Sequence, residues 1–220
     1  VAVNHGRLKN NVGAFHQPVA IIADTSCLAR LPDREFRNGL AEVIKSAMIR
    51  DADFFRYLEG DIDRVLARDE DALERIVSVT ARIKAAVVQE DEKDTGLRNI
   101  LNYGHTAGHG IESASSFALC HGECVAIGME VAGRIAAELG LGLAADVGRQ
   151  RALLIRAGLP VTVPGDVKVE EVLSAMARDK KLSRGRLRFI LPTSIGEVVI
   201  RDDVPMDLVR DALLRSYVLV

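Results

Sequence analysis

The chain has 220 residues, of which 48% are hydrophobic and 27% are charged, and its formal net charge is −2. This length allows one large domain, or one domain with part of a second, and the near-neutral charge argues against nucleic-acid binding through a basic surface. No apolar stretch is long enough for a membrane span and no targeting segment is recognisable, so we expect a cytoplasmic protein. Three cysteines without the spacing of a disulfide framework agree with a reducing compartment.

The first elements in chain order are extended. Because the chain starts with Val1 and not with Met, we expect that it is a processed or excised part of a longer protein. Residues 19–23 form a short apolar run that ends at Asp24, which is typical of a buried strand in a parallel sheet. We interpret this region as the remnant of an α/β domain.

The rest of the chain is predicted to be mainly helical, because apolar residues recur at three- and four-residue intervals. Two β-rich runs near the C-terminus, 187–191 and 198–200, predict a small hairpin. The predicted helices cover residues 33–59 with a break near Asp51, 71–90, 102–113, 121–139, 144–157 and a last segment from about Pro205. The expected fold class is therefore a helical bundle with a small C-terminal β-hairpin.

Three of the five histidines lie close together in the sequence: His105, His109 and His121. His105 and His109 are four residues apart, so a helix places them on one face, one turn apart, where a single metal ion can bridge them. Such a pair alone is as often structural, but the third histidine favours a metal site with room for a carboxylate or a water. A softer set of Cys120, His121 and Cys124 is an alternative, although such thiols are more typical of small buried residues.

Charged residues also occur in otherwise apolar or histidine-adjacent segments. Glu42 and Lys45 are one turn apart in an apolar helix, where a surface ion pair is the ordinary explanation. Because charges in an apolar segment are costly unless they bind something, we interpret Glu42 as a metal ligand and Lys45 as an anion contact. Further charges between Lys84 and Arg98 lead into the first histidine and are typical of phosphate or carboxylate recognition.

Taken together, these segments resemble the 3-dehydroquinate synthase family, within the wider sugar-phosphate cyclases. The resemblance runs along almost the whole chain in ordered motifs, which is more specific than any one motif. The residues that carry it are Asn4-His5, Lys9-Asn10, 13–18, 39–45, Lys84, Asp91-Glu92, 96–98, 101–106, His109, 121–123 and Asp179-Lys180-Lys181.

The resemblance implies an NAD- and metal-dependent carbon-oxygen lyase. Its reaction converts 3-deoxy-arabino-heptulosonate 7-phosphate to 3-dehydroquinate and phosphate in the shikimate pathway of aromatic amino acid biosynthesis. The steps are transient oxidation by NAD, loss of phosphate, re-reduction, ring opening and an intramolecular aldol closure. The metal is usually Zn²⁺, with Co²⁺ or another divalent ion as a substitute.

The resemblance also implies a role for each matching residue. The implied metal ligands are Glu42, His105 and His121, so that His109 becomes a catalytic residue beside the metal. The implied catalytic residues are His109, Lys45, Asn102 and Asp94, the last in place of a more common Glu. The implied substrate-binding residues are Asn10, Lys84, Arg98, Lys180 and Lys181. The implied NAD contacts are Lys9, Cys27, Leu28, Ala29 and Arg30.

Residues 1–30 would then be the end of an N-terminal NAD-binding α/β domain, and residues 31–220 a helical metal- and substrate-binding domain. The implied partners are the anionic sugar phosphate, the N-terminal domain of the parent protein and a second copy in a homodimer, with no nucleic acid and no membrane. Since the chain begins after the expected Gly-Gly-Lys turn and nucleotide-binding fold, we expect it to bind NAD poorly on its own.

Three alternatives stay open. One is another cyclase of the aminodehydroquinate, inosose or valiolone type. Asn102 favours the dehydroquinate type over the last two, because the resemblance implies an acidic residue at that position in them. The second is a metal-dependent polyol dehydrogenase of the same superfamily, and the third is a helical binding module, which the intact metal-ligand set disfavours.

Overall fold

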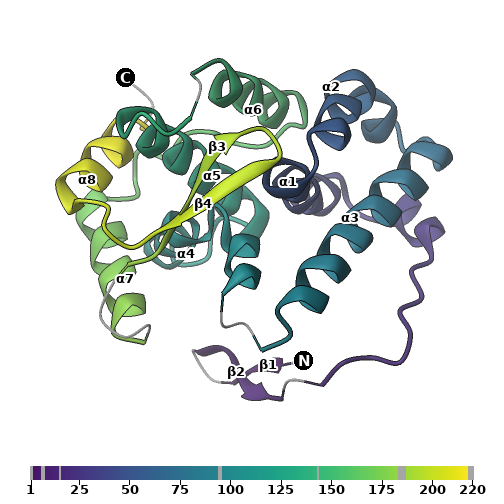
Figure 1. Ribbon diagram of the computed structural model, residues 1–220, viewed down its shortest axis with the longest axis horizontal. Coiled ribbons are helices and arrows are strands. Elements are labelled where there is room, and N and C mark those ends of the chain that lie inside the picture. The colour runs from purple at the N-terminus through teal and green to yellow at the C-terminus, as the bar shows by residue number, and fades with distance from the viewer. Residues whose placement is uncertain are drawn as a thin grey trace.

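The computed structural model describes residues 2–5, 8–14, 16–93, 96–142, 144–182 and 187–217, and for residues 2, 4, 5, 8–11 and 179–182 only the backbone. Within these ranges the chain is mainly helical, as predicted, and ends in a β-hairpin followed by a short helix (Figure 1). The α-helices are α1 (Asp33–Arg50), α2 (Ala52–Leu66), α3 (Glu70–Glu90), α4 (His105–Ala114), α5 (His121–Glu138), α6 (Ala144–Arg156), α7 (Val169–Leu182) and α8 (Met206–Leu214).

The remaining elements are short. Two 3-10 helices, η1 (Thr25–Arg30) and η2 (Leu97–Asn102), precede α1 and α4. Each of two antiparallel hairpins forms its own sheet, one from β1 (Ala2–His5) and β2 (Leu8–Gly13), the other from β3 (Phe189–Ser194) and β4 (Glu197–Arg201). The second hairpin confirms the prediction from the C-terminal β-rich runs.

The boundary between α1 and α2 follows from one residue. The backbone N–H of Asp51 donates to Ala47 O and ends α1, while its carboxylate accepts a hydrogen bond from Phe54 N at 2.8 Å and caps α2. This capped break lies where the sequence predicted it. It turns the chain so that α2 packs its apolar face against its neighbours, with Phe55 and Leu58 fully buried.

Helix α5 is at the centre of the fold. It contacts α1, α4, α6, α8 and β3, and because 13 of its 18 residues are buried, it is a core helix on almost every side. Its small residues allow this close packing: a Cβ on Gly128 would lie 1.9 Å from the carbonyl oxygen of Gly104. The stripe of small residues is therefore packed inside the described fold and is not free for a subunit contact.

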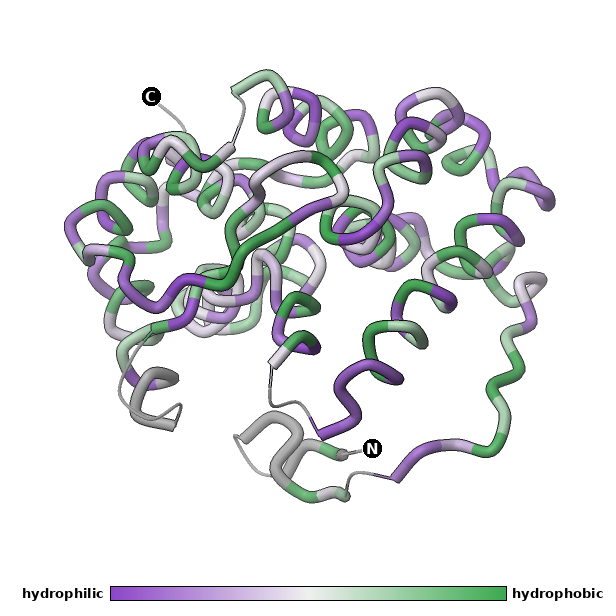
Figure 2. Tube along the Cα trace, in the orientation of Figure 1, coloured by the Kyte–Doolittle hydropathy of each residue, from purple (hydrophilic) through white to green (hydrophobic). Residues whose placement is uncertain are grey.

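Residues 19–23 do not form the predicted buried strand. The side chains of Val19, Ile21 and Ile22 are exposed to 106%, 79% and 95%, in an extended segment that Figure 2 shows as a hydrophobic stretch away from the helices. A strand needs a neighbour for its backbone hydrogen bonds, and none of the described strands pairs with this run. The extended start of the chain is part of β1, whereas β2, α7 and the two 3-10 helices were not anticipated from the sequence.

None of the described helices is long and apolar enough to cross a membrane.

Candidate metal centre

The structure brings the three clustered histidines together. Helix α4 begins with His105 and carries His109 one turn later, and α5 begins with His121. The ring centroid of His105 lies 5.2 Å from that of His109 and 5.1 Å from that of His121. The ring centroids of His109 and His121 are 5.8 Å apart. One nitrogen from each ring lies within 4.8 Å of the others, which is close enough for a shared ion.

This convergence follows from how α4 and α5 pack. The backbone of Gly104 meets Gly128, and Gly108 meets Cys124, so the two helices run in opposite directions with their glycines in contact. Gly104 also has a φ of +77°, a left-handed conformation that starts α4. As a result, the face of α4 that carries His105 and His109 lies beside the first turn of α5, which begins with His121.

Glu42 reaches the cluster from α1. Its Oε1 lies 3.7 Å from His105 Nε2 and 3.9 Å from His121 Nε2. Although 42% of the side-chain surface is exposed, Oε1 itself is covered by protein and has no hydrogen-bond partner within the described residues. Ligand atoms around a tetrahedral Zn²⁺ lie about 3.3–3.6 Å apart, so this orphaned oxygen and the two nitrogens fit a divalent ion.

Lys45 sets the charge of this site. Its side chain is only 5% exposed and its Nζ lies 2.6 Å from Oε2, the other carboxylate oxygen of Glu42. Burial raises the pKa of Glu42, but the charge and hydrogen bond of Lys45 outweigh it, so the net shift is downward. Burial lowers the pKa of Lys45, partly offset by Glu42, and the charge of Lys84 on α3 lowers it further. Glu42 is thus ionised, and two lysines from different helices act on one site.

His105 is held in place through its other nitrogen. Its Nδ1 lies 3.1 Å from the carbonyl oxygen of Tyr103, which leaves Nε2 directed at Glu42. Tyr103 is fully buried and its hydroxyl donates to Gln150 Oε1 at 2.5 Å, so the carbonyl belongs to a rigid part of the core. Burial, helped by the charge of Lys45, lowers the pKa of His105 to about 4. The imidazole is therefore neutral near pH 7, the form that binds metals.

Sequence reasoning missed one carboxylate of the centre, Glu112. It is 7% exposed on α4, and its Oε2 lies 3.4 Å from His121 Nδ1. The signal that would have found it is helical spacing: Glu112 follows His109 by three residues and His105 by seven, and so shares their face.

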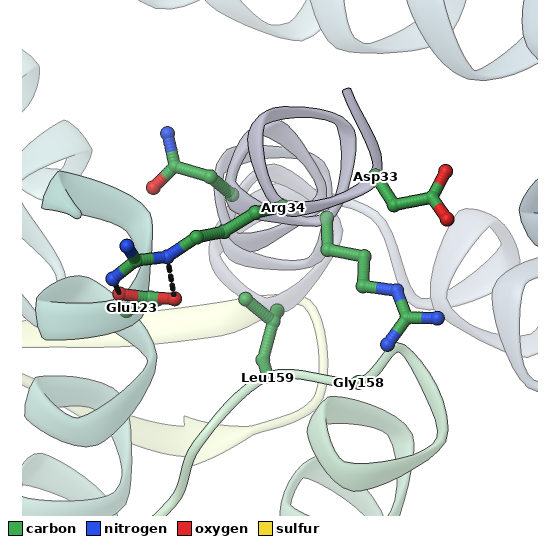
Figure 3. Close-up of a pocket in the computed structure, with 7 residues that line it drawn as sticks. Asp33, Arg34, Glu123, Gly158 and Leu159 are labelled. Atoms are coloured by element: carbon green, nitrogen blue, oxygen red, sulfur yellow. Dashed lines mark hydrogen bonds and ion pairs between the residues drawn. The ribbon is translucent and has the colours of Figure 1, made fainter. Parts of the chain in front are cut away.

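Two polar contacts join α1 to the first turn of α5. The guanidinium of Arg34 donates to both carboxylate oxygens of Glu123 at 2.9 and 2.8 Å, as Figure 3 shows, and Glu123 in turn accepts from Cys120 N at 2.7 Å. Asn38 Oδ1 accepts from Gly122 N at 2.5 Å. The hydrogen bond from Arg34 lowers the pKa of Glu123, so this pair is ionised. Because Glu42 follows Asn38 by one turn, these contacts also set its distance from α5.

A pocket of about 320 Å³ lies beside these contacts. Its charges are largely committed, since Arg34 is paired with Glu123 and Asp33 with Arg68 at 2.8 Å. The histidine cluster, with its orphaned oxygen, is therefore the stronger candidate functional site. The residues that line the pocket are Asp33, Arg34, Arg37, Asn38, Glu123, Gly158 and Leu159 (Figure 3).

Two further predicted residues lie on the segment that leads into α4. Arg98 is half-buried in η2; its backbone N–H donates to Asp91 Oδ2 at 3.0 Å and its side chain to Glu92 O at 3.1 Å. Asn102 is the last residue of η2 and is exposed, three positions before His105. Both are thus placed by the same short helix that positions the first histidine.

The predicted NAD contacts lie elsewhere. Residues 27–30 form part of η1, where Cys27, Ala29 and Arg30 are exposed and Leu28 is half-buried. Arg68 donates to Ala29 O at 2.6 Å and holds η1 near α3. No described hydrogen bond or ion pair joins η1 to the histidines.

Five predicted residues fall where side chains are not described. Lys9 and Asn10 are in β2, and Lys180 and Lys181 are in the last turn of α7, each with only its backbone described; Asp94 lies outside the described residues. Their predicted roles stay predictions.

The alternative thiolate site gains no support. All three cysteines are free thiols, with Cys27 exposed, Cys120 half-buried and Cys124 buried. Burial raises the pKa of Cys120, which disfavours the thiolate that a metal needs. Among the described residues, the group with metal-binding geometry consists of histidines.

Family models and sequence relatives match most of the chain. A family model described as 3-dehydroquinate synthase C-terminal matches residues 39–182, and one described as 3-dehydroquinate synthase N-terminal matches residues 1–38. The chain is 48% identical over 214 residues to 3-dehydroquinate synthase from Picosynechococcus and 50% identical over 204 residues to that from Dehalococcoides mccartyi strain CBDB1. These alignments cover 96% and 93% of this chain but only 59% and 56% of the relatives.

Solved structures of related cyclases share the fold. A 2-epi-5-epi-valiolone synthase from Streptomyces hygroscopicus, with NAD⁺ and Zn²⁺ bound, superposes with a TM-score of 0.86 at 29% identity, over 94% of this chain and 58% of that one. A 2-deoxy-scyllo-inosose synthase, complexed with carbaglucose-6-phosphate, NAD⁺ and Co²⁺, gives 0.84 at 27% identity, over 98% and 61%.

Proposed function

The chain belongs to the 3-dehydroquinate synthase family, and we propose that the protein that contains it converts 3-deoxy-arabino-heptulosonate 7-phosphate to 3-dehydroquinate and phosphate. The reaction makes it an NAD- and metal-dependent lyase of the shikimate pathway. The observation that carries the proposal is the buried, orphaned Oε1 of Glu42, which faces Nε2 of both His105 and His121.

Glu42, His105 and His121 are proposed to hold the divalent ion. A carboxylate and two imidazoles form a donor set that accepts Zn²⁺, Co²⁺ and several other ions, and two solved relatives carry Zn²⁺ or Co²⁺. When bound, the ion supplies a Lewis acid that lowers the pKa of a substrate hydroxyl.

The other residues of the centre act on the charges of the substrate. Lys45 and Lys84 present positive charge from two helices, and Arg98 adds a guanidinium on η2, so we propose that they bind the carboxylate and phosphate and fix the conformation of a flexible substrate. His109 is exposed beside the two ligand imidazoles, where it can take or return a substrate proton. Asn102, exposed at the end of η2, is proposed to bind a substrate hydroxyl.

The dehydroquinate reaction is favoured over other cyclase reactions because this chain is more similar in sequence to 3-dehydroquinate synthases than to the other cyclases. The curated 3-dehydroquinate synthases are 48% and 50% identical to this chain, whereas the valiolone and inosose synthases are 29% and 27% identical. A different carbocyclic product is therefore the competing outcome of the assay below. No observation favours a polyol dehydrogenase.

NAD binding is proposed to depend on an N-terminal domain that completes the region of residues 1–30. Supporting this, the relatives are longer than the matched part, and the N-terminal family model matches only residues 1–38.

A homodimer and a cytoplasmic location are further parts of the proposal. Light scattering tests the homodimer, and cell fractionation tests the location.

The test is an assay of the whole protein with NAD, Zn²⁺ and the heptulosonate phosphate, in which phosphate release is followed and the carbocycle is identified by mass spectrometry and NMR. We expect stoichiometric phosphate and 3-dehydroquinate. Phosphate release with another carbocycle would retain the family and reject the substrate. No phosphate release from a zinc-loaded, folded protein would reject the cyclase proposal.

A further inference from the structure

We propose that Glu112 is a positioning residue of the metal centre: its carboxylate holds Nδ1 of His121 so that Nε2 points at the ion. This inference deepens the proposed function and rests on the metal site described there. It starts from the 3.4 Å approach of Glu112 Oε2 to His121 Nδ1.

Geometry leaves each nitrogen of His121 with its own neighbour. Nε2 lies 3.9 Å from Glu42 Oε1, on the side of the proposed ion, and Nδ1 faces Glu112. A carboxylate accepts hydrogen bonds and cannot donate one when ionised, so it selects the form of the imidazole with a proton on Nδ1. That form leaves the lone pair of Nε2 free for a metal ion.

The two proposed imidazole ligands are thus held by different acceptors. His105 uses the carbonyl oxygen of Tyr103, which the fold supplies through the backbone, whereas His121 uses a side-chain carboxylate. The difference follows from exposure, because the side chain of His121 is 34% exposed and that of His105 only 13%. The more exposed ring has fewer neighbours to fix its orientation and depends more on a specific partner.

Burial supports the same role. Glu112 is only 7% exposed, so the surrounding protein restricts its side chain and keeps the carboxylate beside the ring of His121. Removal of such a partner commonly weakens metal binding about 10- to 100-fold.

The experiment is a titration of the metal-free chain with Zn²⁺ and Co²⁺, read by calorimetry and by the visible absorption of bound Co²⁺. We expect Glu112→Gln to weaken affinity about tenfold and Glu112→Ala about 100-fold, with Glu112→Asp, which keeps the charge, binding more tightly than Glu112→Ala. The Co²⁺ absorption bands should shift in Glu112→Gln, because the ring of His121 is no longer fixed by a carboxylate.

The matched control is Glu130→Gln. Glu130 is a buried carboxylate on α5 whose partners are Arg134 and Arg151, each at 2.8 Å, and it has no described contact with the histidines. We expect this variant to lose stability but to keep wild-type affinity and absorption bands. Unchanged affinity in Glu112→Gln, or an equal loss in Glu130→Gln, would overturn the inference. A wild-type chain that binds neither ion would instead reject the proposed metal site.

Discussion

At the scale of single residues, the role of His109 separates two interpretations of the same cluster. Its ring is close enough to His105 and His121 to be a third imidazole ligand, but Glu42 already faces the other two with an orphaned oxygen. We therefore predict that His121→Ala loses most of its bound Zn²⁺ and that His109→Ala retains it, as measured by metal analysis after dialysis. Equal loss in the two variants would place His109 on the metal.

The buried position of His105 predicts a pH dependence of stability in the metal-free chain. Its pKa is about 4 when folded, against an ordinary value of 6.5, so between these pH values the unfolded chain binds a proton that the folded chain does not. Stability should therefore fall as the pH drops from 6.5 to 4, by on the order of 3 kcal/mol from this group. Above pH 6.5 the group contributes nothing.

Urea unfolding of the metal-free chain at pH 7.5 and pH 4.5 measures this effect. His105→Gln removes the ionisable ring, so the variant should lose less free energy of unfolding between the two pH values than the wild type does. The same loss in both proteins would show that His105 is not the group responsible.

At the scale of elements, the sequence predicted what depends on neighbouring residues. The Asp51 cap between α1 and α2, the end of α6 before the left-handed Gly158, and the hairpin after residue 187 were all visible as local patterns. The prediction of a buried strand at residues 19–23 was wrong. An apolar run indicates that a segment becomes buried against another part of a protein, but it does not identify that part. Pairing of Glu112 with His121 was missed for a related reason, since it depends on how α4 packs against α5.

The crossing of α1 and α5 yields the sharpest prediction at this scale. A Cβ on Gly122 would lie 2.0 Å from the carbonyl oxygen of Asn38, a backbone atom that cannot move without shifting α1. Gly122→Ala should therefore cost about 3 kcal/mol of stability and also separate Glu42 from His121, which weakens Zn²⁺ binding. Thermal unfolding and zinc titration measure the two effects.

A helical glycine with free space around it provides the control. Apart from the adjacent residues and the nearby backbone of α6 itself, no described atom lies within 4 Å of the position of a Cβ on Gly148, so Gly148→Ala should gain about 0.5–1 kcal/mol and leave Zn²⁺ binding unchanged. A stable Gly122→Ala protein with normal affinity would show that this crossing does not set the geometry of the site.

At the scale of the whole molecule, the metal centre and the predicted NAD contacts occupy different parts of the chain. The proposed ligands come from α1, α4 and α5, which pack together in one buried core. The predicted NAD contacts fall at residue 9 and in η1, beside the exposed apolar residues Val19, Ile21 and Ile22. About 25 cal/mol of stabilisation per Å² is available from covering such a surface, so this region is the natural place for a further domain to pack.

We therefore predict that the 220-residue chain binds Zn²⁺ but not NAD. Calorimetry should show one Zn²⁺ site, whereas NADH fluorescence should not change when the chain is added at micromolar concentration. A longer protein that also carries the proposed N-terminal domain should bind both, and substitution of Ile21 and Ile22 by Ser in it should weaken NADH binding without affecting Zn²⁺. Tight NADH binding by the chain alone would show that residues 1–30 suffice for the cofactor, and would remove the reason for assigning the exposed apolar segment to a domain contact.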